Sequence, residues 1–161
     1  DGFAGVAWSQ SRRIDGAALK DLGWKQFEAL AAELLSRYWQ ANNCWLTNDG
    51  PDAGADVLMT TEDGTGILLQ CKHTNGNSFD GTSAINEVLG ARVVYENQLG
   101  KPIGRLYFVT NAHRIAPISR QRAEMGDVGI IDGRRLGELL EHYPVFYRDI
   151  QIRLTKTRYR L

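Results

Sequence analysis

Two short apolar runs joined by a tight-turn sequence constrain the fold of this chain more than any other feature. The runs are ADVLMTT, residues 55–61, and GILLQCK, residues 66–72, and EDGTG connects them. An Asp-Gly pair between two strand-like runs is a strong signal for a β-hairpin. The pairing predicted across this turn brings Asp56 opposite the Gln70–Lys72 end of the second strand.

The sequence after residue 104 alternates between strand-like and helical stretches. RLYFVT and VGIID are strand-like, and APISRQRAEMG and GRRLGELLEHY are the helical stretches that follow them. Such alternation is typical of parallel strands connected by helices. Amphipathic helices are also predicted over residues 22–39 and 84–100. We therefore expect an α/β domain with a central mixed sheet, in which an antiparallel hairpin precedes parallel strands and helices flank both faces.

The 161 residues suit a single domain. Its core is expected over about residues 20–142, with an N-terminal extension at 1–19 and a basic C-terminal extension at 143–161. In the latter, DIQIRLTKTRYRL alternates Ile150, Ile152 and Leu154 with polar residues, which predicts a final edge strand. Because the chain does not begin with Met, we expect a domain excised from a longer protein.

Composition narrows the functional classes. The formal net charge is zero, so no global basic field indicates a nucleic-acid partner. No apolar run approaches the roughly 20 residues of a membrane span. The two cysteines suggest reduced thiols and a cytoplasmic location. The three histidines, His73, His113 and His142, lack the spacing of zinc ligands.

Polar groups end the second hairpin strand, which begins by burying hydrocarbon. Alternate side chains of a strand share a face, so Gln70 and Lys72 point one way and Cys71 the other. With Asp56 opposite, a carboxylate, an amide and an ammonium group meet at the open end of the hairpin. Carboxylate and amide oxygens suit Mg²⁺, and a lysine beside the ion can hold the attacking water. This set is suited to metal-assisted phosphodiester hydrolysis.

Gln70 carries no charge, so a second acid would strengthen such a site. Glu28 lies near the apolar stripe of the first helix and is our candidate for that acid. Each residue alone has an ordinary explanation, such as a solvated helix position or a strand-edge carboxylate. Their order and spacing together favour the catalytic interpretation.

Four pieces in order, FEALAAELL, GPDAGADVLM, LLQCK and YFVTNAHRIAPISRQRAEMGDVGIIDGRRLGELL, resemble the Mrr-like branch of the PD-(D/E)xK nuclease superfamily. In that branch glutamine replaces the second acid, which gives a D…QxK motif. The resemblance spans roughly residues 22–140 and implies a three-layer restriction-endonuclease-like fold. It matches Asp56, rather than Asp52 of the literal Pro-Asp pair, to the motif's aspartate.

The resemblance further implies a Mg²⁺-dependent endonuclease of DNA, with Mn²⁺ able to substitute. Asp56, Gln70 and the Cys71 carbonyl would hold the ion, and Glu28 would do so directly or through water. Lys72 would be the catalytic lysine. Family members act in restriction of foreign or modified DNA, often with a separate recognition or motor domain, and a homodimer on DNA is expected.

Two other functions stay open: an inactive nuclease-like domain that binds DNA or acts as a scaffold, and a repair or junction-resolving nuclease of the same fold. Candidate DNA contacts include basic residues of the tail, which could equally form a solubilising terminus. His113 follows a strand, where a substrate contact is a better interpretation than a general base. These candidates are Arg148, Arg153, Lys156, Arg158, His73 and His113.

Overall fold

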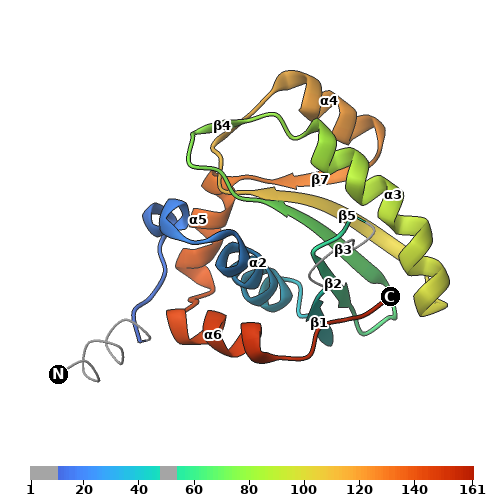
Figure 1. Ribbon diagram of the computed structural model, residues 1–161, viewed down its shortest axis with the longest axis horizontal. Coiled ribbons are helices and arrows are strands. Elements are labelled where there is room, and N and C mark those ends of the chain that lie inside the picture. The colour runs from blue at the N-terminus through green and yellow to red at the C-terminus, as the bar shows by residue number, and fades with distance from the viewer. Residues whose placement is uncertain (1–10, 48–53) are drawn as a thin grey trace.

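The computed structural model describes residues 11–47 and 54–161, and these form a five-stranded mixed sheet between two layers of helices (Figure 1). The strands lie in the order β1-β2-β3-β5-β7. Their bounds are Asn43–Leu46 (β1), Val57–Thr60 (β2), Gly66–Lys72 (β3), Ile103–Thr110 (β5) and Val128–Ile131 (β7). The helices are η1 (Gly16–Asp21), α2 (Trp24–Tyr38), α3 (Thr82–Leu99), α4 (Pro117–Met125), α5 (Gly133–His142) and α6 (Tyr147–Thr155). The expected mixed sheet flanked by helices is confirmed.

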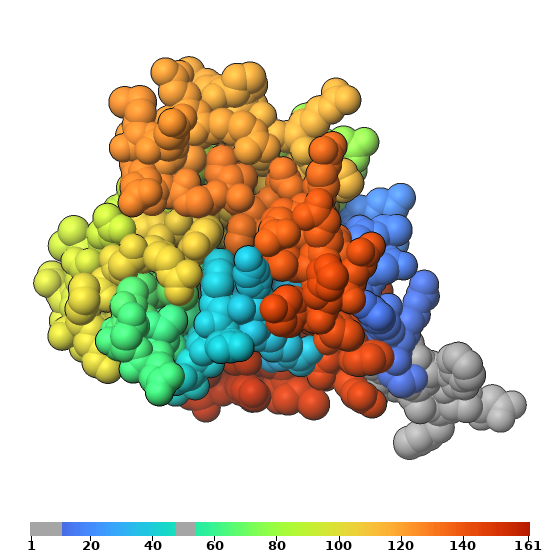
Figure 2. Space-filling view, turned by 180° about the vertical axis from the view of Figure 1, so that it is seen from behind, coloured from blue at the N-terminus to red at the C-terminus, as the bar shows by residue number. Residues whose placement is uncertain are grey.

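β2 and β3 form the antiparallel hairpin that EDGTG predicts, with Val57 opposite Leu69. Beyond this pair, the backbone N–H of Asp56 donates to the Leu69 carbonyl at 2.8 Å, so residue 56 continues the hairpin at its open end. At the closed end, the Asp63 carboxylate accepts a hydrogen bond from the backbone N–H of Thr65 at 3.0 Å. This turn lies beside the start of β5, as the view from behind shows (Figure 2). β5 then pairs in parallel with both β3 and β7.

Alternate residues of β3 bury two separate cores. Leu69 and Cys71 face the core formed with α2, α5 and α6. Leu68 faces the second core, formed with α3 and α4. Because strand side chains alternate, Gln70 and Lys72 are directed to the same side as Leu68. The polar end of β3 therefore faces α3.

The predicted C-terminal edge strand is wrong, because residues Tyr147–Thr155 form helix α6. Ile150 is fully buried whereas Ile152 is 54% exposed, so the alternating apolar residues do not share one strand face. Ile150 and Arg153, three residues apart, lie on the side of the helix that is buried. The contact of α6 with α2, which is a tertiary interaction, selects the helix.

Residues from both expected extensions contribute to the core. Ile14 and Val145 are fully buried, and the backbone N–H of Ile14 donates to the Val145 carbonyl at 2.9 Å. A further pair of short strands, β4 (Ser78–Phe79) and β6 (Arg114–Ile115), lies outside the main sheet. Within residues 11–47 and 54–161, no helix has the length and apolar character needed to cross a membrane.

Candidate active site

Asp56 and the end of β3 form the centre of the candidate site. Oδ2 of Asp56 accepts a hydrogen bond from the backbone N–H of Cys71 at 2.7 Å. Because Cys71 lies between Gln70 and Lys72, this bond places the carboxylate next to both residues. The structure thus brings together the acid, amide and ammonium groups that the hairpin pairing predicts.

A carboxylate that sequence reasoning missed completes this corner. Nε2 of Gln70 donates a hydrogen bond to Oε2 of Glu87 at 2.5 Å, and Nζ of Lys72 lies 3.6 Å from the same oxygen. Gln70 is 4% exposed, whereas the side chains of Lys72 and Glu87 are 37% and 41% exposed. Glu87 belongs to α3, the helix that Gln70 and Lys72 face. Strand alternation shows that Gln70 and Lys72 share a face. Glu87 could have been found from the sequence only if the helix that covers that face had also been known.

Glu28 reaches the site from the other helical layer. It lies on α2, is 8% exposed, and lines the same cavity as Asp56, Gln70, Lys72 and Glu87. The cavity has a volume of about 370 Å³. The site therefore opens between the two layers of helices and receives one acid from each.

Gly54 sets how closely the Asp56 segment approaches α3. Its φ is +93°, and a Cβ at this position would lie only 2.4 Å from the backbone oxygen of Glu87. A left-handed conformation and this close contact both favour glycine. Gly54 thereby places the loop before Asp56 directly against the turn of α3 that carries Glu87. Asp52 lies outside the described residues.

Cys71 and His73 also line the cavity of the candidate site. Burial raises the pKa of the Cys71 thiol well above its usual value, and the carboxylates of Asp56 and Glu28 act in the same direction. The thiol therefore stays protonated. Nε2 of His73 donates to the Leu19 carbonyl at 2.9 Å, which fixes the imidazole as a wall of the cavity.

Residues 19–140, which are most of the chain, match the sequence model of the restriction endonuclease family Mrr_cat. The chain belongs to this family. Membership confirms both the Mrr-like resemblance and the restriction-endonuclease-like fold expected from the sequence. No curated protein sequence matches the chain at a significant level.

Three solved structures show partial similarity to this Mrr_cat domain. Protein VC1899 from Vibrio cholerae is 17% identical, with a TM-score of 0.52 over 73% of this chain and 32% of its own. A repair endonuclease from Pyrococcus abyssi is 12% identical, with a TM-score of 0.41 over 55% of this chain and 36% of its own. An EndoMS–dsDNA complex is 12% identical, with a TM-score of 0.41 over 65% of this chain and 44% of that chain. The similarity to VC1899 is one of fold, and the Mrr_cat chain spans less than half of each of these proteins.

Restriction-like nucleases generally use divalent metal ions, and the candidate site offers suitable oxygen atoms. Among the residues that the structure describes, no three His, Cys, Asp or Glu side chains gather closely enough to hold an ion. Amide and backbone oxygens must therefore complete a ligand set. Oε1 of Gln70 is buried and has no hydrogen-bond partner among the described residues. An unpaired buried acceptor costs about 1–3 kcal/mol, and a hard cation shared with Asp56 would satisfy it. The donor set fits Mg²⁺.

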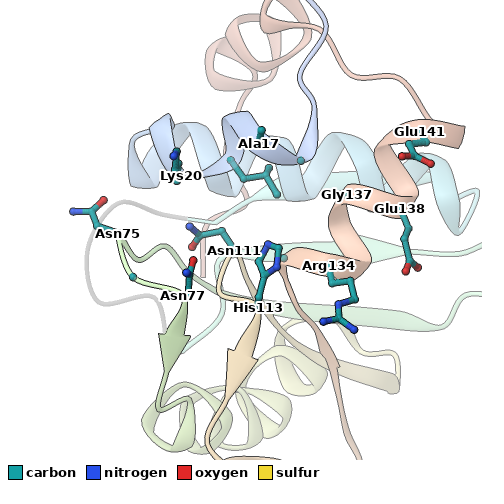
Figure 3. Close-up of a pocket in the computed structure, with 14 residues that line it drawn as sticks. Ala17, Lys20, Asn75, Asn77, Asn111, His113, Arg134, Gly137, Glu138 and Glu141 are labelled. Atoms are coloured by element: carbon teal, nitrogen blue, oxygen red, sulfur yellow. The ribbon is translucent and has the colours of Figure 1, made fainter.

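A second hollow, of about 510 Å³, is lined by residues of η1, of α5 and of the segments that follow β3 and β5 (Figure 3). Lys20 of η1 and Arg134 of α5 are the cationic side chains of its lining, Glu138 and Glu141 of α5 are the anionic ones, and His113 after β5 lies between Lys20 and Arg134. Leu19 lines this hollow, and its carbonyl accepts a hydrogen bond from His73 of the candidate site, so the two cavities adjoin. His113 is therefore located in the adjoining hollow rather than beside Asp56. We name this hollow the second groove.

Asn111, which lines the second groove, also holds the segment that follows β3. Its Oδ1 accepts a hydrogen bond from the backbone N–H of Thr74 at 2.8 Å, and its Nδ2 donates to the Thr74 carbonyl at 2.7 Å. Both groups of the amide are thus used to hold the backbone two residues after Lys72.

Arg153, one of the candidate DNA contacts, is located inside the fold. It is 8% exposed, its Nε lies 2.6 Å from Oε1 of Glu33, and its Nη1 donates to the Cys44 carbonyl at 2.7 Å. The candidate phosphate contact is therefore wrong for this residue. The reason is that Arg153 belongs to the buried side of α6.

The other basic residues of the tail differ in their surroundings. Nη1 of Arg158 donates to the Thr47 carbonyl at 2.7 Å, which ties the end of the chain to β1. Arg148 and Lys156 are exposed on and after α6. These two residues present charge to the solvent.

Proposed function

We propose that the chain is a single Mg²⁺-dependent endodeoxyribonuclease domain that acts in the restriction of foreign or modified DNA. Membership of the Mrr_cat family supports DNA cleavage. The observation that carries the metal dependence is the buried Oε1 of Gln70, which has no hydrogen-bond partner within residues 11–47 and 54–161 and shares a cavity with Asp56. Mn²⁺ is expected to substitute for Mg²⁺, since both accept carboxylate and carbonyl oxygens.

Asp56, Oε1 of Gln70 and the carbonyl of Cys71 would hold the ion. Glu28, which lines the same cavity from α2, would contribute directly or through water. When bound, the ion supplies a Lewis acid that stabilises charge developing on the phosphate oxygens. The hydrogen bond from Cys71 N–H keeps the Asp56 carboxylate in place before any ligand arrives.

Lys72 is proposed to orient the water that attacks phosphorus. Its ammonium group has three donors and lies at the open side of the cavity, where it can also counter negative charge on the phosphate. The ion pair with Glu87, at 3.6 Å, restricts the rotation of the Lys72 side chain.

The second groove is proposed to receive the DNA backbone next to the scissile phosphate. Lys20 of η1 and Arg134 of α5 are its cationic side chains, with His113 between them (Figure 3). Of the two carboxylates that also line it, Glu138 and Glu141, Glu138 pairs with Arg135 at 3.2 Å. Arg148 and Lys156 stay candidates for more distant contacts. Cleavage of both strands would need two sites, so we propose a homodimer on DNA. Choice of the target would come from a fused recognition or motor domain outside this chain.

Plasmid cleavage with Mg²⁺ or Mn²⁺ tests this function. Asp56→Ala and Lys72→Ala should each lose about a hundredfold or more of the rate, whereas Lys101→Ala, an exposed cation elsewhere, should cut normally. Asp56→Asn provides a folding control, because its amide oxygen can still accept from Cys71 N–H. Normal cleavage by Asp56→Ala would show that the active site lies elsewhere.

Salt dependence of DNA binding tests the role of the second groove. Lys20→Ala and Arg134→Ala should each weaken binding and lower the slope of log K against log salt by about 1. Lys101→Ala again serves as the control. A slope unchanged in both groove variants would exclude the groove as a backbone contact.

The two alternatives predict different results. An inactive DNA-binding or scaffold domain would retain DNA in all variants and in the parent chain, without cutting. A repair or junction-resolving nuclease would cut branched or mismatched DNA in preference to linear duplex. A competition between linear, branched and methylated substrates separates these functions.

A further inference from the structure

The hydrogen bond between Gln70 and Glu87 joins the amide of the D…QxK motif to a carboxylate outside it. We propose that Glu87 is a positioning residue, which orients the Gln70 amide and supplies the negative charge that glutamine lacks at this place. The assignment rests on the proposed metal-dependent function. It concerns a residue on α3 that the motif does not include.

The direction of the Gln70 amide follows from the chemistry of its partner. A carboxylate only accepts hydrogen bonds, so Nε2 rather than Oε1 must face Glu87. This leaves Oε1 buried and, in the part of the chain that the structure describes, without a hydrogen-bond partner. Without the carboxylate, the amide could turn over and present its nitrogen, which does not bind cations. Glu87 therefore selects the orientation in which Gln70 can be a ligand.

The same carboxylate adjusts the charge of the site. Hydrogen bonds in a chain polarise one another, so donation by Nε2 to an anion increases the negative charge on Oε1. Oε2 of Glu87 also lies 3.6 Å from Nζ of Lys72, which balances the ammonium group beside the proposed ion. The pair formed by Gln70 and Glu87 thus replaces the single acid found in the usual (D/E)xK motif.

The backbone on both sides keeps Glu87 at this distance. Ala84, Val88 and Ala91 of α3 are buried against the sheet, which fixes the rotation of the helix. Gly54 packs against the backbone of Glu87 itself. The fold therefore holds the backbone of Glu87 beside Gln70.

Mn²⁺ binding in the absence of DNA, measured by titration calorimetry, provides a readout apart from activity. Glu87→Ala should weaken Mn²⁺ binding by about tenfold or more, which is typical for loss of a partner that orients a metal ligand. Glu124→Ala removes an exposed carboxylate from α4 and should leave the affinity unchanged. Unchanged affinity in Glu87→Ala would overturn the assignment alone, while absence of Mn²⁺ binding by the parent chain would overturn the proposed function as well.

A swapped pair separates positioning from simple loss of packing. The double variant Gln70→Glu/Glu87→Gln keeps one carboxylate and one amide in contact, and it should recover the Mn²⁺ affinity that Glu87→Gln loses. If the effects of the two single variants simply add, the two residues are not coupled and the assignment is wrong.

The metal-free protein gives an independent test by NMR. The side-chain amide proton of Gln70 that is bonded to Glu87 should resonate downfield in the parent chain and return to the ordinary range in Glu87→Ala. An identical resonance in both proteins would contradict the proposed orientation.

Discussion

Replacement of Arg153 by alanine should destabilise the fold by about 3–5 kcal/mol, the usual cost of removing one partner of a buried ion pair. The guanidinium lies 2.6 Å from Glu33, and its side chain is only 9% exposed. Its removal leaves the Glu33 carboxylate with Arg37 alone, at 3.1 Å, and removes the donor to the Cys44 carbonyl. At about 2–4 °C per kcal/mol for a domain of this size, the melting temperature should fall on the order of 10 °C.

Thermal and urea denaturation measure this loss, and DNA binding at several salt concentrations measures any role in recognition. Arg148→Ala removes an exposed cation from the same helix and should change the stability by no more than about 0.5 kcal/mol. The double variant Arg153→Met/Glu33→Leu should recover much of the stability, since apolar replacement of both partners is often neutral. If Arg153→Ala kept its melting temperature but lowered the salt slope of DNA binding, the guanidinium would be a DNA contact and the reasoning from burial would be refuted.

Three further predictions concern Gly54 before Asp56, the thiol of Cys44 and the carboxylate of Asp63 in the hairpin turn. Gly54→Ala should lower the free energy of unfolding by roughly 2 kcal/mol or more. The φ of Gly54 is +93°, and a Cβ there would lie 2.4 Å from the backbone oxygen of Glu87. Equal urea midpoints of the variant and the parent chain would contradict this. Burial raises the pKa of Cys44 to about 11, so about one thousandth of the thiol is ionised at pH 8, and alkylation should be more than a hundredfold slower than in urea. Hydrogen bonds from the Thr61 hydroxyl and the backbone of Thr65 lower the pKa of Asp63 from 3.8 to about 2. This carboxylate therefore stabilises the fold above pH 3.8 and loses that effect as the pH falls toward 2, so the stability difference between the parent chain and Asp63→Asn should be smaller at pH 3 than at pH 7.

Much of the candidate site follows from local rules. The EDGTG turn sets the register in which Asp56 lies opposite the end of β3, and strand alternation places Gln70 and Lys72 on one side with Cys71 on the other. These relations depend on residues within about twenty positions of one another, where backbone geometry leaves few choices. The pattern of strands and helices likewise predicted the mixed sheet.

The C-terminal segment could not be assigned in this way. Ile150, Ile152 and Leu154 fit a strand by alternation, but Ile150 and Arg153 fit one side of a helix equally well. The choice between them depends on α2, whose buried Glu33 pairs with Arg153 across 120 positions of sequence. Arg153, which the sequence places in a basic tail, therefore forms an ion pair inside the fold.

The amino-acid sequence by itself determined the hairpin, the family motif and the acid–amide–ammonium set, because each depends on neighbours in the chain. Only the tertiary structure decided that Glu87 binds Gln70 and Lys72, since that contact requires α3 to cover one particular face of β3. Pattern reasoning can determine which residues share a face, but the packing of layers decides which helix they meet.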